Sequence, residues 1–479
     1  MKFNKLFLLT ITLFTLTSCF EDRDDNGIFA SEINDFVWKG MNAVYLYKDE
    51  IPDLANDRFN SDQEYADYLN SFSTPEDLFE SVIYQREIVD RFSFIYDDYI
   101  ELNQLLSGTS LTNGLRFYSF ASPSNSNERI LVIRQVLSGS VADVANLERG
   151  QYVIKIDDTT ITSDNINDLL GATTYTLHFA DYDDNGTPEY SDDIFTPNGN
   201  TQTLTKVAFT SNPVQLTDII DVEGEKLGYI LYNAFNADFN TQLNNAFADF
   251  QSNNIDHLVI DLRYNGGGSV NTARLLGSMV TGQFNGQIFS KLIYNSTLQS
   301  NNTNFEFVNN FNGTTINNLN LSKVYVLTTA STASASELII NSLRPYITVV
   351  QIGEVTVGKT QASITIYDSP DLTPTNINPN HTYVMQPLIA NSINVNDTAV
   401  PGTGLIPDVT LNESVVNLGI LGDVNEPLLA AAINDILGNP GRFNNQIPIV
   451  PMSNDIKYHP LEKEMYIQHK EINLEQNFN

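Results

Sequence analysis

Cysteine, histidine and basic side chains are all scarce in this 479-residue sequence. The single cysteine excludes an intramolecular disulfide bond and a zinc site built from cysteines. The five histidines include no His-Glu-x-x-His pair, so the sequence does not indicate a histidine metal centre. Only 25 Lys and Arg oppose 58 Asp and Glu, and the formal net charge of −33 repels phosphate groups. The composition therefore excludes general nucleic-acid binding and adhesion to anionic membranes through a basic patch.

Apolar residues are abundant enough for a folded protein. They make up 42% of the chain, whereas charged residues make up 17%, which lies outside the range of disordered chains. Domains commonly hold roughly 100–200 residues, so the length predicts about two to four of them.

The N-terminus has the pattern of an export signal. Lys2 and Lys5 supply the positive start, and residues 6–16 form an apolar run too short to span a bilayer. The next residues complete a Leu-Thr-Ser-Cys sequence, which matches the bacterial lipobox, in which the cysteine becomes the lipidated first residue. We therefore expect residues 1–18 to be removed and Cys19 to carry the lipid. The alternative is an ordinary secretory signal with an incidental cysteine.

An acidic cluster, Phe-Glu-Asp-Arg-Asp-Asp, follows Cys19 directly. It resembles the surface-export signal of Bacteroidetes lipoproteins, and it is equally compatible with a solvated tether over residues 19–29. These features predict a lipid-anchored outer-membrane lipoprotein in the cell envelope of a Bacteroidetes-type bacterium. They leave open whether it faces the periplasm or the cell surface.

The spacing of apolar residues divides the rest of the chain and predicts a multi-domain α/β protein. Residues 30–105 repeat apolar positions at steps of three and four, which predicts a small helical N-terminal domain. Residues 106–210 change to short β-like runs. Strand-like and helix-like runs alternate over residues 211–437, as in an α/β core. We expect residues 438–479 to be a partly ordered C-terminal tail.

The second region resembles a PDZ domain. A strand-like run at 129–134 is followed by a small-residue helix over 138–150, which a glycine closes, and by a further strand. A Gly-Leu-Arg-Phe sequence stands where PDZ domains carry the loop that holds a peptide's C-terminal carboxylate. Its N–H groups can bind an anion, and the next strand can pair with an extended peptide. The expected peptide-binding residues are Gly114, Leu115, Arg116 and Phe117. The alternative is a plain turn into a strand.

An acidic stretch at residues 181–193 partly fits a calcium-binding loop. Oxygen ligands at alternate positions would wrap the ion, and Gly186 would allow the sharp turn. The candidate ligands are Asp181, Asp183, Asn185, Glu189 and Asp192. The twelfth position is Asp rather than Glu, and no helix is expected beside the loop. Both observations favour an acidic hairpin tip without a metal over a structural calcium site.

Three segments carry residues suited to catalysis. The first, residues 261–270, ends a strand with Asn-Gly-Gly-Gly, and consecutive glycines allow positive φ angles and close approach of the backbone to a ligand. N–H groups on such a turn can bind a developing oxyanion. The second, residues 332–337, reads Thr-Ala-Ser-Ala-Ser-Glu and places a serine at a helix start, where N–H groups favour negative charge.

Each segment also has a simpler explanation. The glycines fit a flexible turn, and Ser334 with Glu337 fits a capping box, which the local sequence alone favours. The third segment holds Lys359 in a run of Val, Thr and Ile. Burial would lower the pKa of this lysine and make its neutral amine a base, whereas most lysines on a strand edge extend to solvent.

Together the three segments resemble the serine peptidases of the C-terminal-processing, or tail-specific, type, peptidase family S41. The family is marked by an Asp-Leu-Arg-x-Asn-x-Gly-Gly strand end, a Thr-Ala-Ser-Ala-Ser-Glu helix start and a Gly-Glu-x-x-x-Gly-Lys run, and all three are present. The family's lysine stands 25 residues after its nucleophilic serine, which here selects Ser334 over Ser331 and Ser336. An embedded PDZ domain and a Gly-x-x-Pro-Asp stretch, matched by residues 404–408, are also typical.

The resemblance implies a serine endopeptidase that cleaves unfolded or C-terminally presented proteins and peptides, without a required cofactor. A Ser334–Lys359 dyad would do the chemistry. The implied oxyanion donors are the N–H groups of Ala335 and of Gly267 or Gly268. Many members carry a glutamine four places after the lysine, whereas this sequence has serine there and glutamine two places earlier. On a strand both positions would face the same side as the lysine, so we expect Gln361 as a supporting residue.

Three alternative functions compete with this interpretation of the sequence pattern. A catalytically silent surface lipoprotein could bind peptides through the PDZ-like region alone. A penicillin-binding or β-lactamase enzyme would carry Ser-x-x-Lys on one helical turn, and no such motif adjoins Ser334. A glycan-binding lipoprotein has no specific support. The sequence leaves the physiological substrate and the oligomeric state open.

Overall fold

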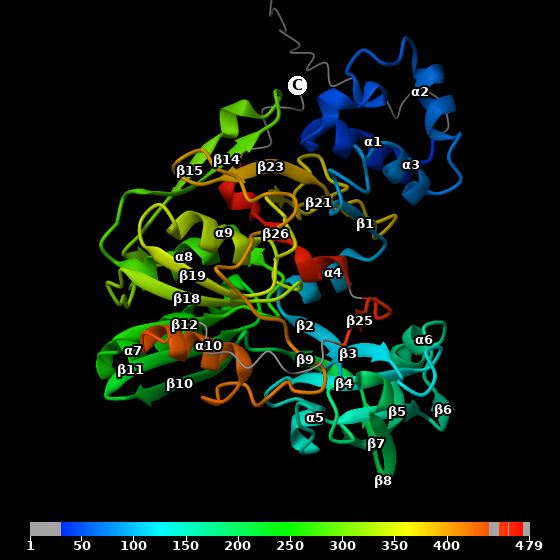
Figure 1. Ribbon diagram of the computed structural model, residues 1–479. Coiled ribbons are helices and arrows are strands. Elements are labelled where there is room, and N and C mark those ends of the chain that lie inside the picture. Colours follow the sequence, from blue (N-terminus) through cyan, green and yellow to red (C-terminus); the bar gives the residue numbers. More distant parts are fainter. Residues whose placement is uncertain (1–29, 440–449, 458, 473–479) are drawn as a thin grey trace, which may run out of the picture.

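The computed structural model describes residues 30–439, 450–457 and 459–472. The expected signal at 1–18, Cys19 and the tether at 19–29 lie outside these described residues. Figure 1 shows a blue helical region, a cyan β-rich region, a green-to-orange α/β region and a red C-terminal segment between them. This arrangement confirms the predicted multi-domain α/β class. Within the described ranges, no helix has both the length and the apolarity needed to cross a membrane.

Polar caps begin the N-terminal helices. The side chains of Ser31, Ser61 and Thr74 each accept a hydrogen bond from an N–H three residues on. The elements of this region are α1 (Glu32–Val44), α2 (Asp62–Leu69), α3 (Pro75–Ser81), β1 (Phe94–Tyr96) and α4 (Tyr99–Leu106). The apolar side chains of α1 and α3 belong to the same buried cluster as the α/β region. These helices therefore share the main core, and their separation as a domain of their own stays a prediction.

The β-rich region is built on one sheet whose central strand is buried on both faces. Its elements are β2 (Thr109–Thr112), β3 (Leu115–Ala121), β4 (Arg129–Val136), α5 (Val141–Val144), β5 (Tyr152–Ile156), β6 (Thr159–Thr160), α6 (Ile166–Gly171), β7 (Thr174–Asp183), β8 (Ile194–Thr205) and β9 (Val207–Thr210). Leu131 and Ile133 of β4 face one apolar cluster, and Ile130 and Val132 face another. The expected helix over 138–150 is present but has only one turn.

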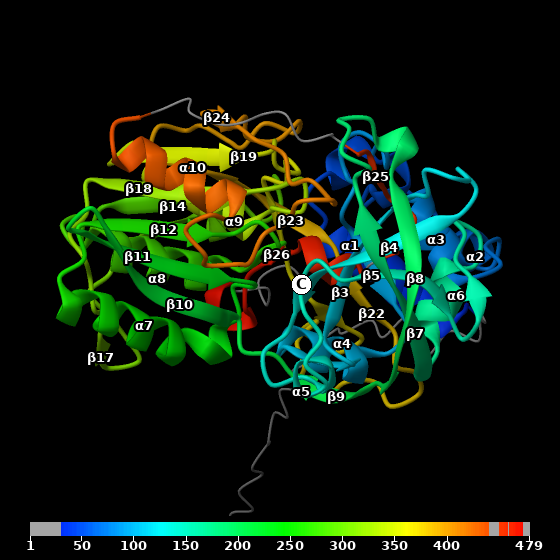
Figure 2. The same cartoon turned by 60° about the horizontal axis from the view of Figure 1, so that its bottom comes forward.

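The predicted α/β core contains a six-stranded sheet in the order β10-β11-β12-β18-β19-β24, parallel from β11 onward. These strands and their helices are β10 (Val214–Val222), β11 (Glu225–Tyr232), α7 (Asn240–Asn253), β12 (His257–Asp261), α8 (Val270–Thr281), β18 (Lys323–Thr328), α9 (Ala335–Leu343), β19 (Thr348–Gly353), β24 (Val409–Thr410) and α10 (Pro427–Ile436). Alternate side chains pack against α7, α8 and α9 on one face and against α10 on the other. Figure 2 shows α7 and α10 on opposite sides of the sheet.

A second six-stranded sheet has the order β13-β26-β20-β23-β14-β15. Its strands are β13 (Gly268–Ser269), β14 (Ile288–Tyr294), β15 (Thr303–Glu306), β20 (Gln361–Ser363), β23 (Leu388–Ile393) and β26 (Met465–Tyr466). The short strands outside these sheets are β16 (Asn310–Phe311), β17 (Thr314–Thr315), β21 (Ile366–Tyr367) and β22 (Val384–Gln386), of which β21 and β22 form a small sheet with β1. β25 (Met452–Ser453) pairs with β3.

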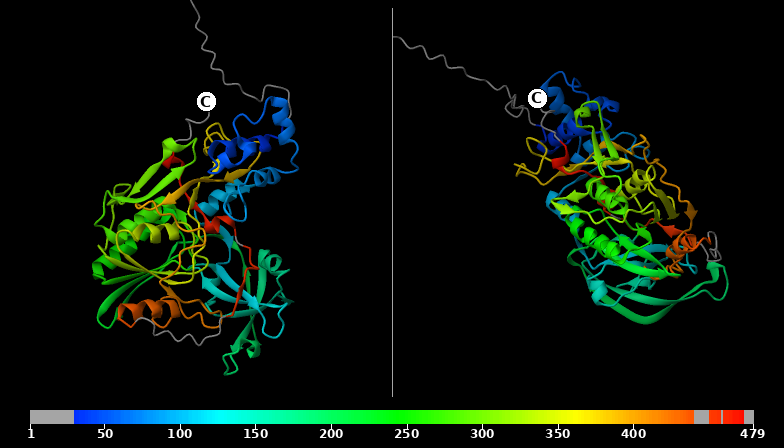
Figure 3. Two further views of the ribbon diagram at one scale, coloured as in Figure 1. Left: turned by 45° about the horizontal axis from the view of Figure 1, so that its top comes forward. Right: turned by 90° about the vertical axis from the view of Figure 1, so that its left-hand side faces the viewer.

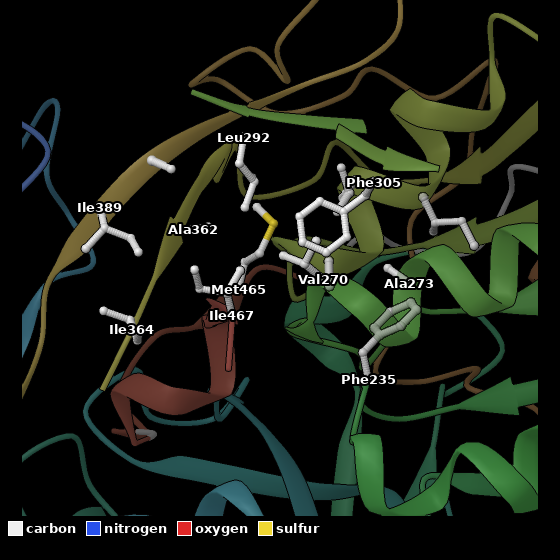
Figure 4. Close-up of a cluster of buried hydrophobic side chains, with 14 of the residues drawn as sticks. Phe235, Val270, Ala273, Leu292, Phe305, Ala362, Ile364, Ile389, Met465 and Ile467 are labelled. Carbon is white, nitrogen blue, oxygen red and sulfur yellow. The ribbon is translucent and has the colours of Figure 1, made fainter. Parts of the chain in front are cut away.

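The C-terminal segment differs from the expected tail. β26 lies inside the second sheet, and Met465 and Ile467 are 1% and 3% exposed within the main core. Figure 4 shows both side chains among the buried apolar residues of this core. Figure 3 shows the red segment running between the green α/β region and the cyan β-rich region. Residues 459–472 are therefore part of the fold, not an appendage to it.

Candidate active site

Neighbouring parallel strands bring the three catalytic segments to one edge of the central sheet. β12, β18 and β19 lie side by side and end at Asp261, Thr328 and Gly353. The glycine turn, the serine loop and the lysine loop follow these ends in that order. Because the carboxyl ends of parallel strands share an edge, the three loops meet there, which is the usual location of ligand sites in such sheets.

Ser334 occupies a strained position at the start of α9. Its backbone has φ 66° and ψ −116°, in the region that favours glycine. The side chain is fully buried, and its hydroxyl oxygen has no hydrogen-bond partner among the described residues. The turn therefore presents an unpaired hydroxyl next to the positive end of a helix.

Glu337 ties the serine loop to the lysine loop. Its Oε2 accepts the N–H groups of Ser334 at 2.7 Å and Lys359 at 2.9 Å. Its Oε1 accepts the N–H of Gly358 at 2.7 Å and the hydroxyl of Thr356. Burial raises the pKa of Glu337, although these four hydrogen bonds oppose the rise. The sequence revealed this residue only as part of a capping box, whereas its second oxygen also holds the lysine loop.

Lys359 is fully buried in the loop before β20 rather than on a strand. Its Nζ donates to Glu464 Oε1 at 2.5 Å and lies 4.8 Å from the centre of the Phe92 ring. Burial lowers the pKa of Lys359, while the Glu464 carboxylate acts in the opposite direction. Among the described residues, no hydrogen bond joins this amine to Ser334. The structure thus brings the two loops together but pairs the amine with Glu464.

Gln361 does not support the lysine as expected. Its Nε2 donates to the Tyr47 hydroxyl at 3.0 Å. The expectation required Lys359 to lie on the strand, but β20 begins two residues later, and its pairing with β23 shifts register before Ser363. The Ser363 hydroxyl instead donates to Glu464, the carboxylate that holds the lysine. Ser363 is therefore the residue of β20 that reaches the lysine's partner.

The glycine turn approaches Ser334 closely. Gly267 and Gly268 have φ angles of 120° and 130°, and a Cβ on Gly267 would lie 2.7 Å from Ser334 Cβ. The Gly267 N–H donates to the Asn265 side chain at 2.9 Å, so Gly267 is not a free oxyanion donor as expected. The Gly268 N–H instead donates to the carbonyl oxygen of Glu464 at 2.6 Å. Ala335, the other expected donor, is the first residue of α9.

A buried charge network supports the glycine turn from behind. Arg263 contacts Asp261 at 2.8 Å, Glu413 at 3.0 Å and Glu426 at 2.6 Å without any exposure to solvent. Arg149 of the β-rich region reaches the same Glu413 at 2.6 Å. Burial opposes ionisation, but the Arg149 and Arg263 guanidinium groups lower the pKa of Glu413 to about 2. The network joins the β-rich region to the strand end that carries the turn.

The Gly114–Phe117 loop is closed rather than open to an anion. The N–H groups of Gly114 and Leu115 donate to the side chains of Thr112 and Asn113. Leu115 and Phe117 are buried in the apolar cluster of the β-rich region. The expected carboxylate nest is therefore already occupied by local hydrogen bonds. The Arg116 side chain, by contrast, forms an ion pair with Glu462 at 2.9 Å.

A cavity of about 480 Å³ lies between the β-rich region and the glycine turn. Its lining includes the cationic side chains of Arg116, Arg134 and Lys206, the three glycines at 266–268, and Glu462 of the C-terminal segment. The cavity thus connects the expected peptide-binding region with the serine edge of the central sheet.

The acidic stretch does not gather the candidate calcium ligands. Asp181 accepts from Asn198 at 2.9 Å, Asp183 from the Asn185 N–H at 2.9 Å, and Asp192 from Thr187 at 2.7 Å. In the described part of the chain, no three His, Cys, Asp or Glu side chains cluster in a way that could hold a metal ion. Glu189, the remaining candidate, directly precedes the short 3-10 helix Tyr190–Asp192.

Comparison with known protein families shows to which family the chain belongs. The model of peptidase family S41 matches residues 226–410, and that of the peptidase S41 N-terminal domain matches residues 32–94. The chain belongs to peptidase family S41. Both matched segments lie on the shared core described above, and the first contains the glycine turn, Ser334 and Lys359. The protein is therefore a serine-type peptidase.

A solved structure of a related protease has the same fold. A crystal structure described as an S41 protease from Bacteroides fragilis NCTC 9343 is 27% identical, with a TM-score of 0.69, over 84% of this chain and 97% of that chain. The photosystem II D1 C-terminal processing protease is 17% identical, with a TM-score of 0.46, over 85% of this chain and 98% of that chain. No curated protein matches the sequence.

Proposed function

We propose that this S41 peptidase is an endopeptidase of the C-terminal-processing type that hydrolyses peptide bonds through Ser334 and Lys359. The observation that carries the proposal is the Ser334 hydroxyl, which is buried, unpaired and held at a strained helix start. Glu337 fixes the backbones of both residues through a single oxygen atom. The substrates are unfolded proteins and proteins that present a C-terminal segment.

In this mechanism, the neutral amine of Lys359 takes the proton of the Ser334 hydroxyl. The oxygen then forms a bond to the carbon of the peptide carbonyl. The lysine, now protonated, gives this proton to the leaving amine as the C–N bond breaks. A water molecule, deprotonated by the same amine, releases the acyl group and restores the serine. Burial supports this role because it lowers the pKa of Lys359 and so increases its neutral fraction.

The N–H groups of Ala335 and Gly268 are the proposed oxyanion donors. The Gly268 N–H already binds a peptide carbonyl, that of Glu464, so its direction suits an oxygen above Ser334. Ala335 is the first residue of α9, where N–H groups lack intrahelical partners. In a comparable site, loss of one such donor costs about 10²–10³ in kcat.

The β-rich region is the proposed PDZ-like site that recruits peptides. The pairing of β25 with the edge of β3 supports recruitment of a peptide by strand addition. Because the Gly114 and Leu115 N–H groups are used locally, recognition would rest on strand pairing and on Arg116. Amidated and free-acid peptides should then bind with similar affinity. A strong preference for the free acid would instead support recognition of a C-terminal carboxylate by the Gly114–Phe117 loop.

Variants of the dyad test the reaction. Ser334→Ala and Lys359→Ala should each abolish hydrolysis of an unfolded protein, followed by mass spectrometry of the fragments, and the double variant should be little worse. Lys359→Arg should be as inactive as alanine, because a guanidinium does not deprotonate in proteins. Circular dichroism controls for folding. Full activity in folded Ser334→Ala would refute the role of Ser334 as the nucleophile. Full activity in folded Lys359→Ala would refute the role of Lys359 as the base.

Lipid anchoring is also proposed, on the lipobox sequence alone. Cys19 lies outside the described residues, and the test is biochemical. Cys19→Ala should leave unprocessed or unlipidated protein. Membrane partitioning of this variant with the same processed mass as wild type would refute the anchor.

A further inference from the structure

The C-terminal segment follows the path expected for a substrate. β25 adds to the edge of β3, with Met452 opposite Phe120 and Ser453 opposite Ser119. Ile456 then packs against the apolar cluster of the β-rich region. Residues 459–467 continue to the glycine turn, where β26 pairs with β13, and Figure 1 shows this red segment between the β-rich and α/β regions. The C-terminal segment thus contacts both β3, the strand proposed to recruit peptides, and the glycine turn at the edge of the central sheet.

Glu462 occupies the entrance of the cleft. Its side chain forms the ion pair with Arg116 at 2.9 Å. Its carbonyl oxygen lies so close to Gly266 that a Cβ on that glycine would be 1.3 Å away. The absence of a side chain at Gly266 is therefore required for the segment to lie where it does.

Glu464 blocks two functions of the site at once. Its carbonyl oxygen accepts the Gly268 N–H at 2.6 Å, the place of an oxyanion. Its carboxylate binds the Lys359 amine at 2.5 Å and accepts the Ser363 hydroxyl. A Cβ on Gly267 would lie 2.5 Å from the Glu464 carbonyl oxygen and 3.0 Å from Ser334 Oγ, so both crowd the same point.

β26 also fills the space between two strands. It pairs in parallel with β13, Gly268 opposite Met465, and with β20, Ser363 opposite Tyr466. The Ile467 N–H donates to the Ser363 carbonyl at 3.1 Å. Gly268 belongs to the glycine turn and Ser363 to the strand after the lysine loop, so an extended substrate would have to displace β26 to use these backbone groups.

We propose that residues 459–467 are an inhibitory segment, which occupies the peptide-binding groove of its own chain as a substrate mimic. The inference rests on the proposed roles of Ser334 and Lys359. A lysine amine bound to the Glu464 carboxylate is not free to accept the serine proton, and a Gly268 N–H that already has an acceptor cannot bind an oxyanion. Because the segment is tethered, its effective concentration at the groove is of millimolar order, so even weak contacts keep it bound.

The contacts define the chemistry that the groove accepts. Its ligand is an extended peptide with acidic side chains, because Arg116 and Lys359 meet Glu462 and Glu464 two residues apart. These cations are notable in a chain whose formal net charge is −33. The segment's own sequence, from His459 to Ile467, is therefore the first peptide to use as a probe.

The first experiment cuts the chain just before the inhibitory segment. A recognition site for a specific protease is inserted after Lys457, which is exposed, and the folded full chain is cut there. Hydrolysis of an unfolded protein should rise at least tenfold after cutting, and a synthetic peptide of residues 459–472 should reverse the rise. Unchanged hydrolysis after the segment has been separated from the chain would overturn the proposal.

The second experiment keeps the chain intact. Glu464→Gln removes the charge that holds Lys359, so hydrolysis should increase severalfold. The matched control is Glu471→Gln, because this half-buried glutamate belongs to the same segment but contacts the Gln468 N–H rather than the catalytic loops. The control should behave as wild type. Loss of hydrolysis in folded Glu464→Gln would overturn the proposal and make Glu464 a positioning residue for Lys359.

A binding measurement separates this proposal from the proposed function. The cut chain carrying Ser334→Ala, freed of its own segment, should bind a fluorescent peptide of residues 459–472 and not a scrambled one. Binding together with inactivity of every form would refute the catalytic function and leave the segment as the ligand of the groove. If the folded chain without its segment does not bind this peptide, the proposal of an inhibitory segment is refuted, whether or not the chain hydrolyses protein.

Discussion

Replacing Glu337 with glutamine tests whether one buried carboxylate sets the positions of both Ser334 and Lys359. The two carboxylate oxygens accept three N–H groups and one hydroxyl, without contact with solvent. Glutamine keeps the shape but has one acceptor oxygen. With that oxygen toward Ser334 and Lys359, its NH2 group faces the Thr356 hydroxyl, which can accept, and the Gly358 N–H, which cannot.

The expected cost follows from these four contacts. One orphaned buried N–H costs about 1–3 kcal/mol, and hydrogen bonds to a neutral amide are weaker than those to a carboxylate. Relief of the buried charge offsets part of this loss, so we expect Glu337→Gln to lower the free energy of unfolding by about 2–4 kcal/mol. Urea denaturation measures this change. Glu354→Gln is the control, because the Glu354 carboxylate accepts the N–H of Ala330 from the same loop region, and it should cost less than about 1.5 kcal/mol.

The activity of Glu337→Gln provides the second readout. The carboxylate raises the pKa of Lys359, so its removal should shift the rising limb of the pH–rate profile to lower pH. At the same time, kcat should fall because the two loops lose their common anchor. Wild-type stability together with an unshifted pH profile would refute the argument that Glu337 couples the serine and the lysine.

Four further predictions follow from individual contacts. Ser334→Gly should be more stable than Ser334→Ala by about 1–2 kcal/mol in urea denaturation, because glycine relieves the positive φ while alanine keeps it; equal stability would contradict the strain. The pKa of Glu413 is lowered to about 2 from its ordinary value of 4.5. Ionised Glu413 therefore stabilises the fold at pH values above about 4.5, and this stabilisation is lost as the pH falls toward 2. Wild type should therefore lose about 3 kcal/mol more than Glu413→Gln over that interval, and parallel curves would argue against the network. Gly266→Ala should expel the segment at 459–467 and make it far more sensitive to limited proteolysis; wild-type resistance would contradict the close contact. Hydrolysis by the cut chain should rise with pH to a midpoint well below about 10.4, because burial lowers the pKa of Lys359, and a midpoint at the free-lysine value would contradict it.

Regular elements and local motifs could be predicted because their signals are local. Alternating strand-like and helix-like runs over residues 211–437 predicted the α/β core, which holds β11, β12, β18 and β19. The resemblance to peptidase family S41, with its 25-residue distance from serine to lysine, selected Ser334 and Lys359, which lie in the two loops that Glu337 joins. These inferences depend on residues near one another in the chain and on motifs that resemble those of the family.

The remaining features depend on contacts between distant parts of the chain. Glu464 lies 105 residues after Lys359, and β26 has only two residues, too few to show any period. The apolar faces of α1 and α3 were visible in the sequence, but not that they pack on the core of the α/β region. Gln361 was misplaced because a register shift within a three-residue strand leaves no sequence signal.

The inhibitory segment also bears on how a buried lysine becomes a base. In the occupied cleft, burial favours the neutral amine and the Glu464 carboxylate favours the ammonium, so the two effects oppose one another. A substrate strand in the same groove would preserve the burial, and where it lacks a carboxylate at that position, only burial would act on the lysine. The pKa of Lys359 would then fall as the segment is replaced by substrate. On this argument, the exchange of one strand for another both opens the Gly268 N–H and generates the base, so that the serine is activated only beneath a bound peptide.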